Sequence, residues 1–181
     1  MKRATIFFIT MLFVLVFAHS AKAALQDKGE GLIYDDDLGI TWMQYANYAD
    51  GTMTWDEAVD WVDGLVFQGY DDWRLPDTDT SCSGKDCTGS DMGHLFYMEG
   101  ITSDSPGLFT DVKPNIYWSA IEDNLNESWR FNFKYGTQGT SDKSQKRYVW
   151  AVRYGESTPP VVPEPISSIL FITGVLYSKL N

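Results

Sequence analysis

The pattern of apolar and polar residues predicts a β-hairpin near the start of the globular part of the chain. Two short apolar runs, residues 31–34 and 40–42, flank the polar segment 35–39, which ends in Gly39. A glycine allows the positive φ that tight hairpin connections often need. We therefore expect two antiparallel strands joined at this turn.

The same pattern predicts two helices. Thr54 is followed three residues later by Glu57, which is the spacing of a capping box. Ser90 is placed to cap a second, shorter helix that runs through Met98 and is ended by Gly100. In the first helix, apolar residues recur at helical intervals and should form a buried stripe: Trp55, Ala58, Val59, Val62 and Leu65.

Beyond the second helix the pattern changes to strands. We predict them at residues 116–120, 129–134 and 148–153. In the second of these, large aromatic residues alternate with polar ones, so that one face is buried and the other exposed. Tyr148, Trp150 and Val152 follow the same alternation. With the two helices, these strands predict an α+β fold.

The N-terminus has the features of a secretory signal peptide. Lys2 and Arg3 precede an apolar run at residues 6–18, and Ala21 and Ala23 form an A-x-A exit. The alternative is a membrane anchor, but the run is shorter than the ~20 residues that span a bilayer. We expect cleavage after Ala23, so that residues 1–23 are removed and the chain folds outside the cytosol.

The C-terminus resembles the PEP-CTERM sorting signal of Gram-negative bacteria. A Pro-rich linker at residues 157–165 ends in Pro163, Glu164 and Pro165, and residues 166–181 contain an apolar stretch followed by Lys179. The resemblance implies that an exosortase in the inner membrane recognises and removes the signal. The protein would be a membrane-anchored intermediate and then pass to the cell surface or extracellular matrix.

Two features leave an ordinary apolar tail as the alternative. The apolar stretch, residues 166–177, is short for a transmembrane helix, which needs ~20 residues. The tail carries Lys179 where the sorting signal has an Arg-rich cluster. Processing of this tail is therefore an expectation that the sequence does not decide.

Composition and charge exclude several classes of partner. The formal net charge is −11, which disfavours nucleic acid and anionic lipid, since both bind through Lys and Arg. Residues 24–111 hold 19 acidic and 3 basic residues, whereas residues 112–157 hold 5 and 7. The basic part could pack against the acidic part, the acidic part could bind cations, or the acids could form a solvated surface.

The globular segment resembles the Lcl C-terminal domain family, a bacterial extracytoplasmic module. The resemblance covers residues 31–153 and rests on an ordered series of segments: 31–35 with 41–42, 55–58, 69–76, 93–97, 109–110, 117–119, 129 with 131, and 150–153. It makes residues 24–156 one domain. It implies a fold related to C-type lectins and formylglycine-generating enzymes, with two helices around a small twisted antiparallel sheet and long loops.

The segment 73–76, within that resemblance, could either contact a ligand or stabilise the fold. Arg74 has five donors in a rigid fork, which can lock a loop by binding carboxylate or carbonyl oxygens. We expect an architectural role for the motif and for three other tryptophans, with ligand contact as the alternative. The residues concerned are Trp73, Arg74, Leu75, Pro76, Trp118, Trp129 and Trp150.

Cys82 and Cys87 lie close together in a polar loop. In an oxidising compartment such a pair predicts a disulfide that shapes the loop. The alternatives are a redox couple or a metal site shared with His94. His94 itself is most simply a half-buried, hydrogen-bonded residue of the second helix.

Acidic residues cluster in the loops. Residues 35–37 are all Asp, Asp71 and Asp72 are adjacent, and Asp77 and Asp79 alternate with Thr78. Calcium prefers six to eight oxygen ligands, and such loops could supply some of them. Solvated turns are the simpler interpretation, and calcium is the one cofactor this pattern suggests.

We therefore predict an exported, exosortase-sorted surface or matrix protein. Its lectin-like domain would bind a glycan or a protein, with no nucleic-acid partner. The sulfated glycosaminoglycans bound by the namesake adhesin of the family are not expected here, because an acidic domain repels polyanions. An enzyme that uses Asp71 and Asp72 on a sugar, and a purely structural matrix component, are the alternatives. We do not expect an enzyme, since no base–nucleophile pair can be assembled from the spacing.

Overall fold

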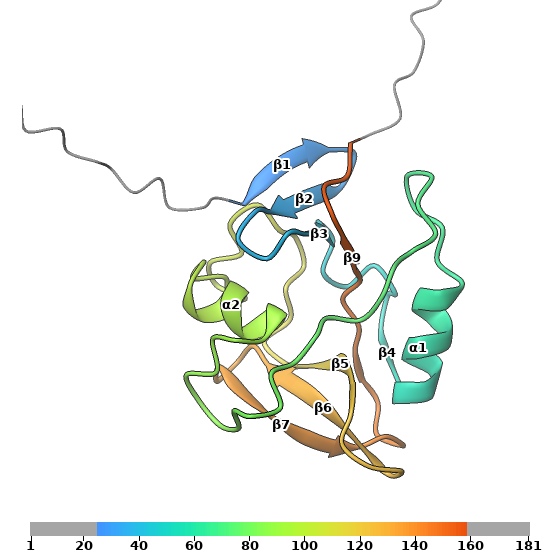
Figure 1. Ribbon diagram of the computed structural model, residues 1–181, viewed down its shortest axis with the longest axis vertical. Coiled ribbons are helices and arrows are strands. Elements are labelled where there is room, and N and C mark those ends of the chain that lie inside the picture. The colour runs from blue at the N-terminus through green and yellow to red at the C-terminus, as the bar shows by residue number, and fades with distance from the viewer. Residues whose placement is uncertain (1–24, 159–181) are drawn as a thin grey trace, which may run out of the picture.

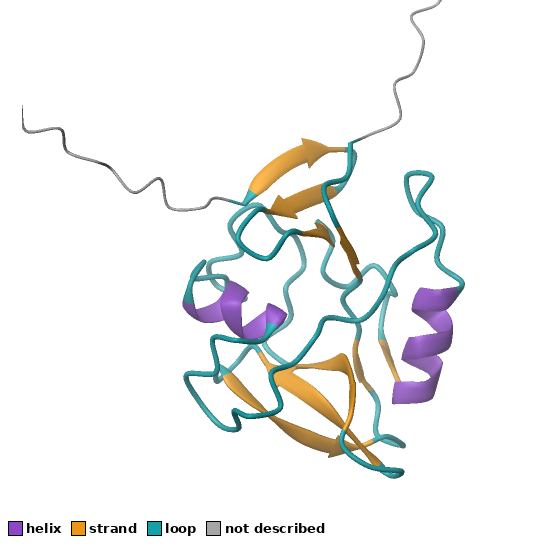
Figure 2. Ribbon diagram, viewed as in Figure 1, coloured by secondary structure: helices purple, strands orange, loops and turns teal. Residues whose placement is uncertain are grey.

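The computed structural model describes residues 25–158, and these residues form an α+β domain with two helices and two sheets. Figure 1 shows the two sheets at opposite ends of the domain, with α2 and α1 on its two sides. Long loops join several of the elements, above all α1 to α2 and α2 to β5 (Figure 2). The predicted α+β class with two helices is therefore confirmed. The predicted signal peptide, the Pro-Glu-Pro motif and the apolar C-terminal stretch lie outside the described residues.

The first sheet brings the beginning and the end of the domain together. Its strands are β1 (Gln26–Gly29), β2 (Leu32–Asp35), β3 (Ile40–Met43) and β9 (Val152–Tyr154), in the spatial order β1-β2-β3-β9. All of its neighbours are antiparallel. The predicted hairpin is β2–β3, with Leu32 opposite Met43 and Asp35 opposite Ile40. Because β1 and β9 are the two edge strands, both ends of the domain belong to this sheet.

The second sheet is built mainly from the later part of the chain. It contains β4 (Thr52–Met53), β8 (Arg147–Tyr148), β5 (Ile116–Glu122), β6 (Glu127–Asn132) and β7 (Thr137–Asp142), in that spatial order. The β5–β8 pair is parallel and the other pairs are antiparallel. The expected single antiparallel sheet is thus two sheets, one of them mixed.

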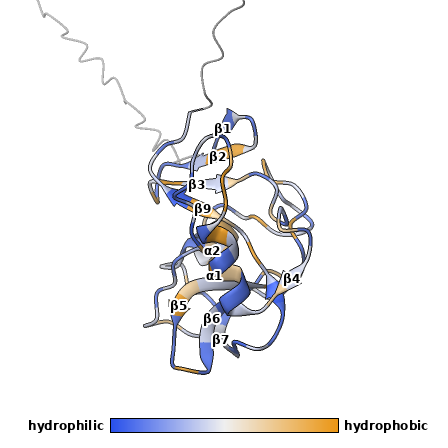
Figure 3. Cartoon of the chain, turned by 90° about the vertical axis from the view of Figure 1, so that its right-hand side faces the viewer, coloured by the Kyte–Doolittle hydropathy of each residue, from blue (hydrophilic) through white to orange (hydrophobic). Residues whose placement is uncertain are grey.

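The helices begin where their caps predict. Helix α1 (Trp55–Asp63) has the capping box, since the Thr54 hydroxyl accepts from the Glu57 amide and the Glu57 carboxylate accepts from the Thr54 amide. The stripe is buried at Trp55, Ala58 and Val62, and the outward residues of α1 are largely hydrophilic (Figure 3). Helix α2 (Asp91–Tyr97) is capped by Ser90.

Two details of the sequence prediction are wrong. Leu65 lies beyond the end of α1 and is only half-buried. The single strand expected at residues 148–153 is two strands, β8 and β9, which belong to different sheets. The chain crosses between the sheets at residues 149–151, where every side chain is buried. Burial on all sides replaces the expected alternation because this segment runs through the core.

The core is mainly aromatic. Trp150 contacts Trp42, Phe109, Tyr117 and Phe133, with ring centroids 4.9–5.8 Å apart. Its indole N–H donates to the Met43 carbonyl oxygen at 2.7 Å. Trp42 comes from the first sheet and Tyr117 from the second, so Trp150 joins both sheets.

A glycine in α2 allows the helix to lie directly against the Cys87 backbone. A Cβ added at Gly93 would lie 1.8 Å from the Cys87 carbonyl oxygen. We predict that Gly93→Ala lowers the free energy of unfolding by about 3 kcal/mol, because backbone must move to relieve the overlap. Gly64→Ala is the matched control, since its Cβ would meet nothing closer than 3.5 Å and its φ is −90°. Urea unfolding of both variants checks this, and equal stabilities would contradict it.

Candidate functional site

The Trp73–Pro76 segment is held inside the domain. Trp73 and Leu75 are buried, and the Arg74 backbone pairs with that of Val152 through two hydrogen bonds of 2.8 and 2.9 Å. The Arg74 guanidinium lies 4.0 Å from the centre of the Tyr154 ring and donates to the Leu75 carbonyl oxygen. These contacts favour the architectural interpretation of the motif.

Arg74 also organises two carboxylates. Asp91 accepts from both terminal nitrogens of Arg74 at 3.3 Å and from the Asp77 amide at 2.8 Å. Burial raises the pKa of the Asp91 carboxyl, although these hydrogen bonds and the nearby guanidinium oppose the shift. Asp77 lies 3.3 Å from Arg74 and accepts from the Tyr154 hydroxyl at 2.7 Å. Asp77 is therefore engaged by the protein itself.

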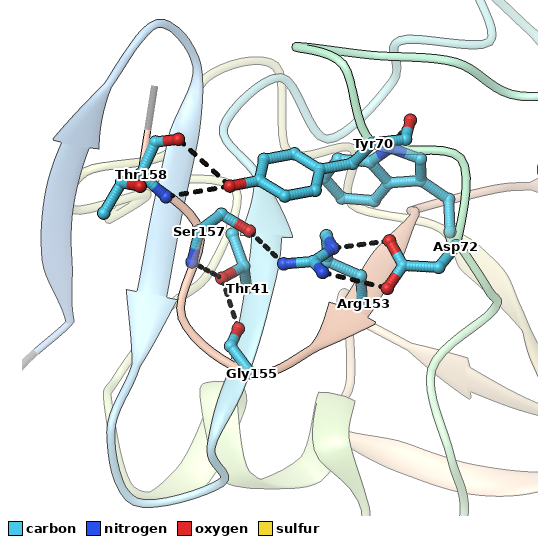
Figure 4. Close-up of polar contacts among 8 residues, drawn as sticks. Thr41, Tyr70, Asp72, Arg153, Gly155, Ser157 and Thr158 are labelled. Carbon is cyan, nitrogen blue, oxygen red and sulfur yellow. Dashed lines mark hydrogen bonds and ion pairs between the residues drawn. The ribbon is translucent and has the colours of Figure 1, made fainter. Parts of the chain in front are cut away.

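A second polar group fixes the end of the domain (Figure 4). Arg153 binds Asp72 through two hydrogen bonds, of 2.6 and 2.9 Å, and donates to the Ser157 hydroxyl at 2.5 Å. The guanidinium also lies 4.0 Å from the centre of the Tyr70 ring. The Ser157 amide, which is buried, donates to the Thr41 hydroxyl at 3.1 Å. We call these residues, Thr41, Tyr70, Asp72, Arg153 and Ser157, the chain-end clamp.

The clamp extends to the last residue described. The Tyr70 hydroxyl donates to the Thr158 carbonyl oxygen at 3.0 Å and accepts from the Thr158 amide at 3.1 Å. Arg153 and Asp72 come from the basic and the acidic parts of the chain, and so do Tyr154 and Asp77. The basic part of the chain thus packs against the acidic part here. This is one of the three interpretations of the charge pattern.

The cysteine loop is closed by the predicted disulfide. Cys82 and Cys87 are bonded, with their Cα atoms 5.5 Å apart. The buried Gln138 side chain on β7 donates to the carbonyl oxygens of Asp79 and Cys82, at 2.8 and 2.7 Å. Since both thiols are used in the disulfide, the alternative of a cysteine–His94 metal site is wrong.

The four loop aspartates considered as calcium ligands, at positions 71, 72, 77 and 79, do not form one site. Asp72 and Asp77 bind Arg153 and Tyr154, respectively, and Asp79 accepts from the Ser81 amide and hydroxyl at 2.9 and 2.6 Å. Asp71 is exposed. None of the four belongs to a cluster of three or more potential metal ligands within residues 25–158.

One cluster in the described part of the chain does have the composition of a cation site. Asp37 on the β2–β3 turn, His94 on α2 and Glu99 just beyond α2 bring three potential ligand atoms within 4.8 Å of one another. Sequence reasoning considered His94 only with the cysteines. The acidic run at residues 35–37 was visible, but nothing in the spacing shows that the turn and α2 meet.

Two of the pockets that the described residues form lie beside the helices. One, of about 210 Å³, lies beside α1 and is lined by Trp55, Val62 and Leu75 among others. The other, of about 310 Å³, is lined by Phe96, Phe133 and Lys134 among others. Pockets that enclose small ligands typically measure ~300–1,000 Å³. Both volumes are at or below the low end of this range, so exposed loops are an alternative binding surface.

The tryptophans are poorly placed to bind a ligand, but some tyrosines are exposed. Six tryptophans are at most 7% exposed, including Trp118, Trp129 and Trp150. In contrast, Tyr45 and Tyr48 are 41% and 44% exposed. Both belong to the segment 44–51, which is joined to the segment 108–113 by backbone hydrogen bonds between Gln44 and Thr110 and between Ala46 and Thr110. We call these two segments the tyrosine loops.

Charged and polar side chains hold the tyrosine loops together. Asp111 binds Lys113 at 2.5 Å and accepts from the side-chain amide of Asn47 at 3.0 Å. The hydrogen bond to Lys113 lowers the pKa of Asp111, and the hydrogen bond to Asp111 raises the pKa of Tyr45. An ordered pair of loops with exposed aromatic rings and polar neighbours is suited to recognition, because little entropy is lost on binding.

Comparison with known proteins places the domain. The Lcl C-terminal domain model matches residues 31–153, which is more than half of the chain. This is a family of bacterial extracytoplasmic domains, consistent with export. No curated protein matches the chain. Within residues 25–158, no helix has the length and apolar character that a membrane crossing requires.

The chain-end clamp predicts a pH-dependent release of the end of the domain. Hydrogen bonds from Arg153 lower the pKa of Asp72 in the folded protein. This ion pair therefore stabilises the fold above the ordinary carboxyl pKa of about 3.9, and the contribution is lost as the pH falls through the lower, folded-state value. We expect Arg153→Gln to raise the pKa of Asp72 towards 3.9, measured by carboxyl NMR titration.

The same clamp predicts slow exchange of a specific amide. Asp72→Asn should accelerate hydrogen exchange at Ser157 by about tenfold near neutral pH, because Arg153 loses its charged partner. Asp71→Asn, which removes an exposed carboxylate from the same loop, should leave the rate unchanged. Equal effects of the two substitutions would show that the clamp does not hold the chain end.

Proposed function

We propose that this chain, which belongs to the Lcl C-terminal domain family, is an exported surface or extracellular-matrix protein that binds a glycan or protein ligand. In this proposal residues 1–23 direct export and an exosortase processes the C-terminal signal. The C-type-lectin-like relationship of the fold is part of the same proposal. What supports it most is the exposure of Tyr45 and Tyr48 on loops that hydrogen bonds hold together.

Both ends of the described chain leave the domain at the first sheet. In Figure 1 the described chain begins at the start of β1 and ends beside the other end of this strand. Lys28 on β1 binds Glu156 at 2.5 Å, which joins the segments that follow the signal peptide and precede the linker. A domain that is tethered through its C-terminal segment would therefore present its opposite end and its sides to the surroundings.

The tyrosine loops supply the surface for a ligand. Tyrosine combines a large apolar ring with a polar hydroxyl and loses little conformational entropy on binding, which suits it to interfaces. Asn47, Asp111 and Lys113 add hydrogen-bonding groups beside Tyr45. An uncharged or partly cationic ligand fits this acidic domain better than a polyanion does.

The enzyme alternative has less support. A carboxyl group that acts as a general acid needs a raised pKa, whereas the hydrogen bonds from Arg153 lower the pKa of Asp72. The Asp72 carboxylate is also occupied by the guanidinium through both oxygens. We therefore assign Asp72 to the clamp and expect no turnover of sugars.

The binding proposal predicts the effect of removing an exposed ring. Tyr45→Ala should reduce retention of the protein in the surface or matrix fraction by about tenfold, as expected when a central aromatic contact is lost. Tyr135→Ala is the matched control, since Tyr135 is 57% exposed but lies between β6 and β7. Fractionation with quantitative immunoblotting measures both, and equal retention of the two variants would contradict this use of the loops.

The sorting proposal predicts an effect of the motif that follows the domain. Replacing Pro163, Glu164 and Pro165 by alanine should leave the protein uncleaved in the membrane fraction of its native host. Replacing Pro159 and Pro160, which lie in the linker outside the motif, should leave processing intact. Mass spectrometry of the mature C-terminus distinguishes the two. Normal release without the motif would identify the tail as an ordinary apolar segment.

A further inference from the structure

The cluster around His94 contains polar atoms that the protein itself leaves unpaired. His94 is 8% exposed and its Nε2 atom is buried, with no hydrogen-bond partner among the described residues. Asp35, at the end of β2, is 2% exposed, and its Oδ2 atom is likewise buried with no hydrogen-bond partner among the described residues. Buried polar groups without partners are costly and uncommon, so two of them on neighbouring side chains require an explanation.

The neighbours of His94 are carboxylates at equal distances. Its Nε2 atom lies 3.8 Å from an oxygen of each of three residues: Asp35, Asp37 and Glu99. These distances are too long for direct hydrogen bonds, which have donor–acceptor distances of ~2.7–3.2 Å. They are, however, close to the separation of ligands that share one small ion. Around a tetrahedral ion with bonds of about 2.1 Å, ligand atoms are about 3.4 Å apart.

We propose that Asp35, Asp37, His94 and Glu99 form a site for a divalent transition-metal ion, with Zn²⁺ as the best fit. His94 and Glu99 are 10% exposed at their side chains and Asp37 is 48% exposed, so an ion can enter from the Asp37 side. Ligand atoms of Asp37, His94 and Glu99 lie within 4.8 Å of one another. Asp35 places a third carboxylate beside this group, since its Oδ1 atom also lies 3.8 Å from Nε2.

The donor set distinguishes between metals. Ca²⁺ and Mg²⁺ prefer oxygen ligands alone, and Ca²⁺ takes six to eight of them. An imidazole nitrogen with a few carboxylates instead suits Zn²⁺, which binds four ligands from His, Asp, Glu and Cys. A cation also offsets the repulsion in the cluster.

The position of the cluster indicates what the ion would do. Asp35 and Asp37 belong to the end of β2 and the following turn, whereas His94 and Glu99 belong to α2 and the residues just beyond it. The ion would join the hairpin of the first sheet to α2. Because the ion would link two separate elements of the fold, we assign it a structural role.

The test is a metal-binding measurement on the full chain, purified in mild detergent and stripped with a chelator. After dialysis against Zn²⁺, elemental analysis should find one Zn²⁺ per chain. The melting temperature should rise by roughly 5–10 °C at a free Zn²⁺ concentration 100 times the Kd. Ca²⁺ and Mg²⁺ at the same concentration should produce neither effect.

Two neighbouring residues provide a matched pair of variants. Asp37→Asn removes a ligand from the half-exposed rim, and we expect the Zn²⁺ affinity to fall at least about tenfold with folding intact. Asp36→Asn removes an exposed carboxylate from the same turn and should bind Zn²⁺ like the unaltered chain. Failure to retain Zn²⁺, or equal affinities of the two variants, would overturn the proposal. Binding of Ca²⁺ in preference to Zn²⁺ would overturn the assignment of the metal.

Discussion

The packing of Trp150 is the constraint on which the two-sheet architecture depends. Its side chain contacts rings from both sheets and its indole N–H is bound to the Met43 carbonyl oxygen. The chain passes from β8 in one sheet to β9 in the other through this residue. Because β9 then pairs with β3 and with Arg74, the position of Trp150 also determines where the Trp73–Pro76 segment and the chain-end clamp are placed. An aromatic side chain of this size contributes several kcal/mol when fully buried.

The charge asymmetry of the sequence has a structural counterpart at the end of the domain. Arg153, from the basic part, lies between Tyr70 and Asp72 from the acidic part and also holds Ser157. At the end of the described residues, the contacts are therefore made by a bidentate ion pair and a cation–ring contact rather than by a regular element. These contacts fix the position of the chain as far as Thr158.

Much of the fold could be predicted from the sequence, but the sites could not. The hairpin at residues 31–42 and both helix caps have local signals, and the structure confirms them. Strand β7 has no such signal, since its residues are polar and it exists through its pairing with β6. The strand prediction at residues 148–153 is wrong because the burial of Trp150 depends on two sheets whose contact the local sequence does not indicate. The same reason hid the His94 cluster, whose members lie on separate elements.

The central claim is that this domain is a binding module, and its most direct test is a screen of the purified full chain against glycans and matrix proteins. We predict saturable binding to a defined ligand, strongest for uncharged or cationic ones, and little binding to sulfated polyanions. If the folded protein bound none of the glycans or matrix proteins, this would contradict the claim. It would favour a structural role in the matrix without a discrete ligand.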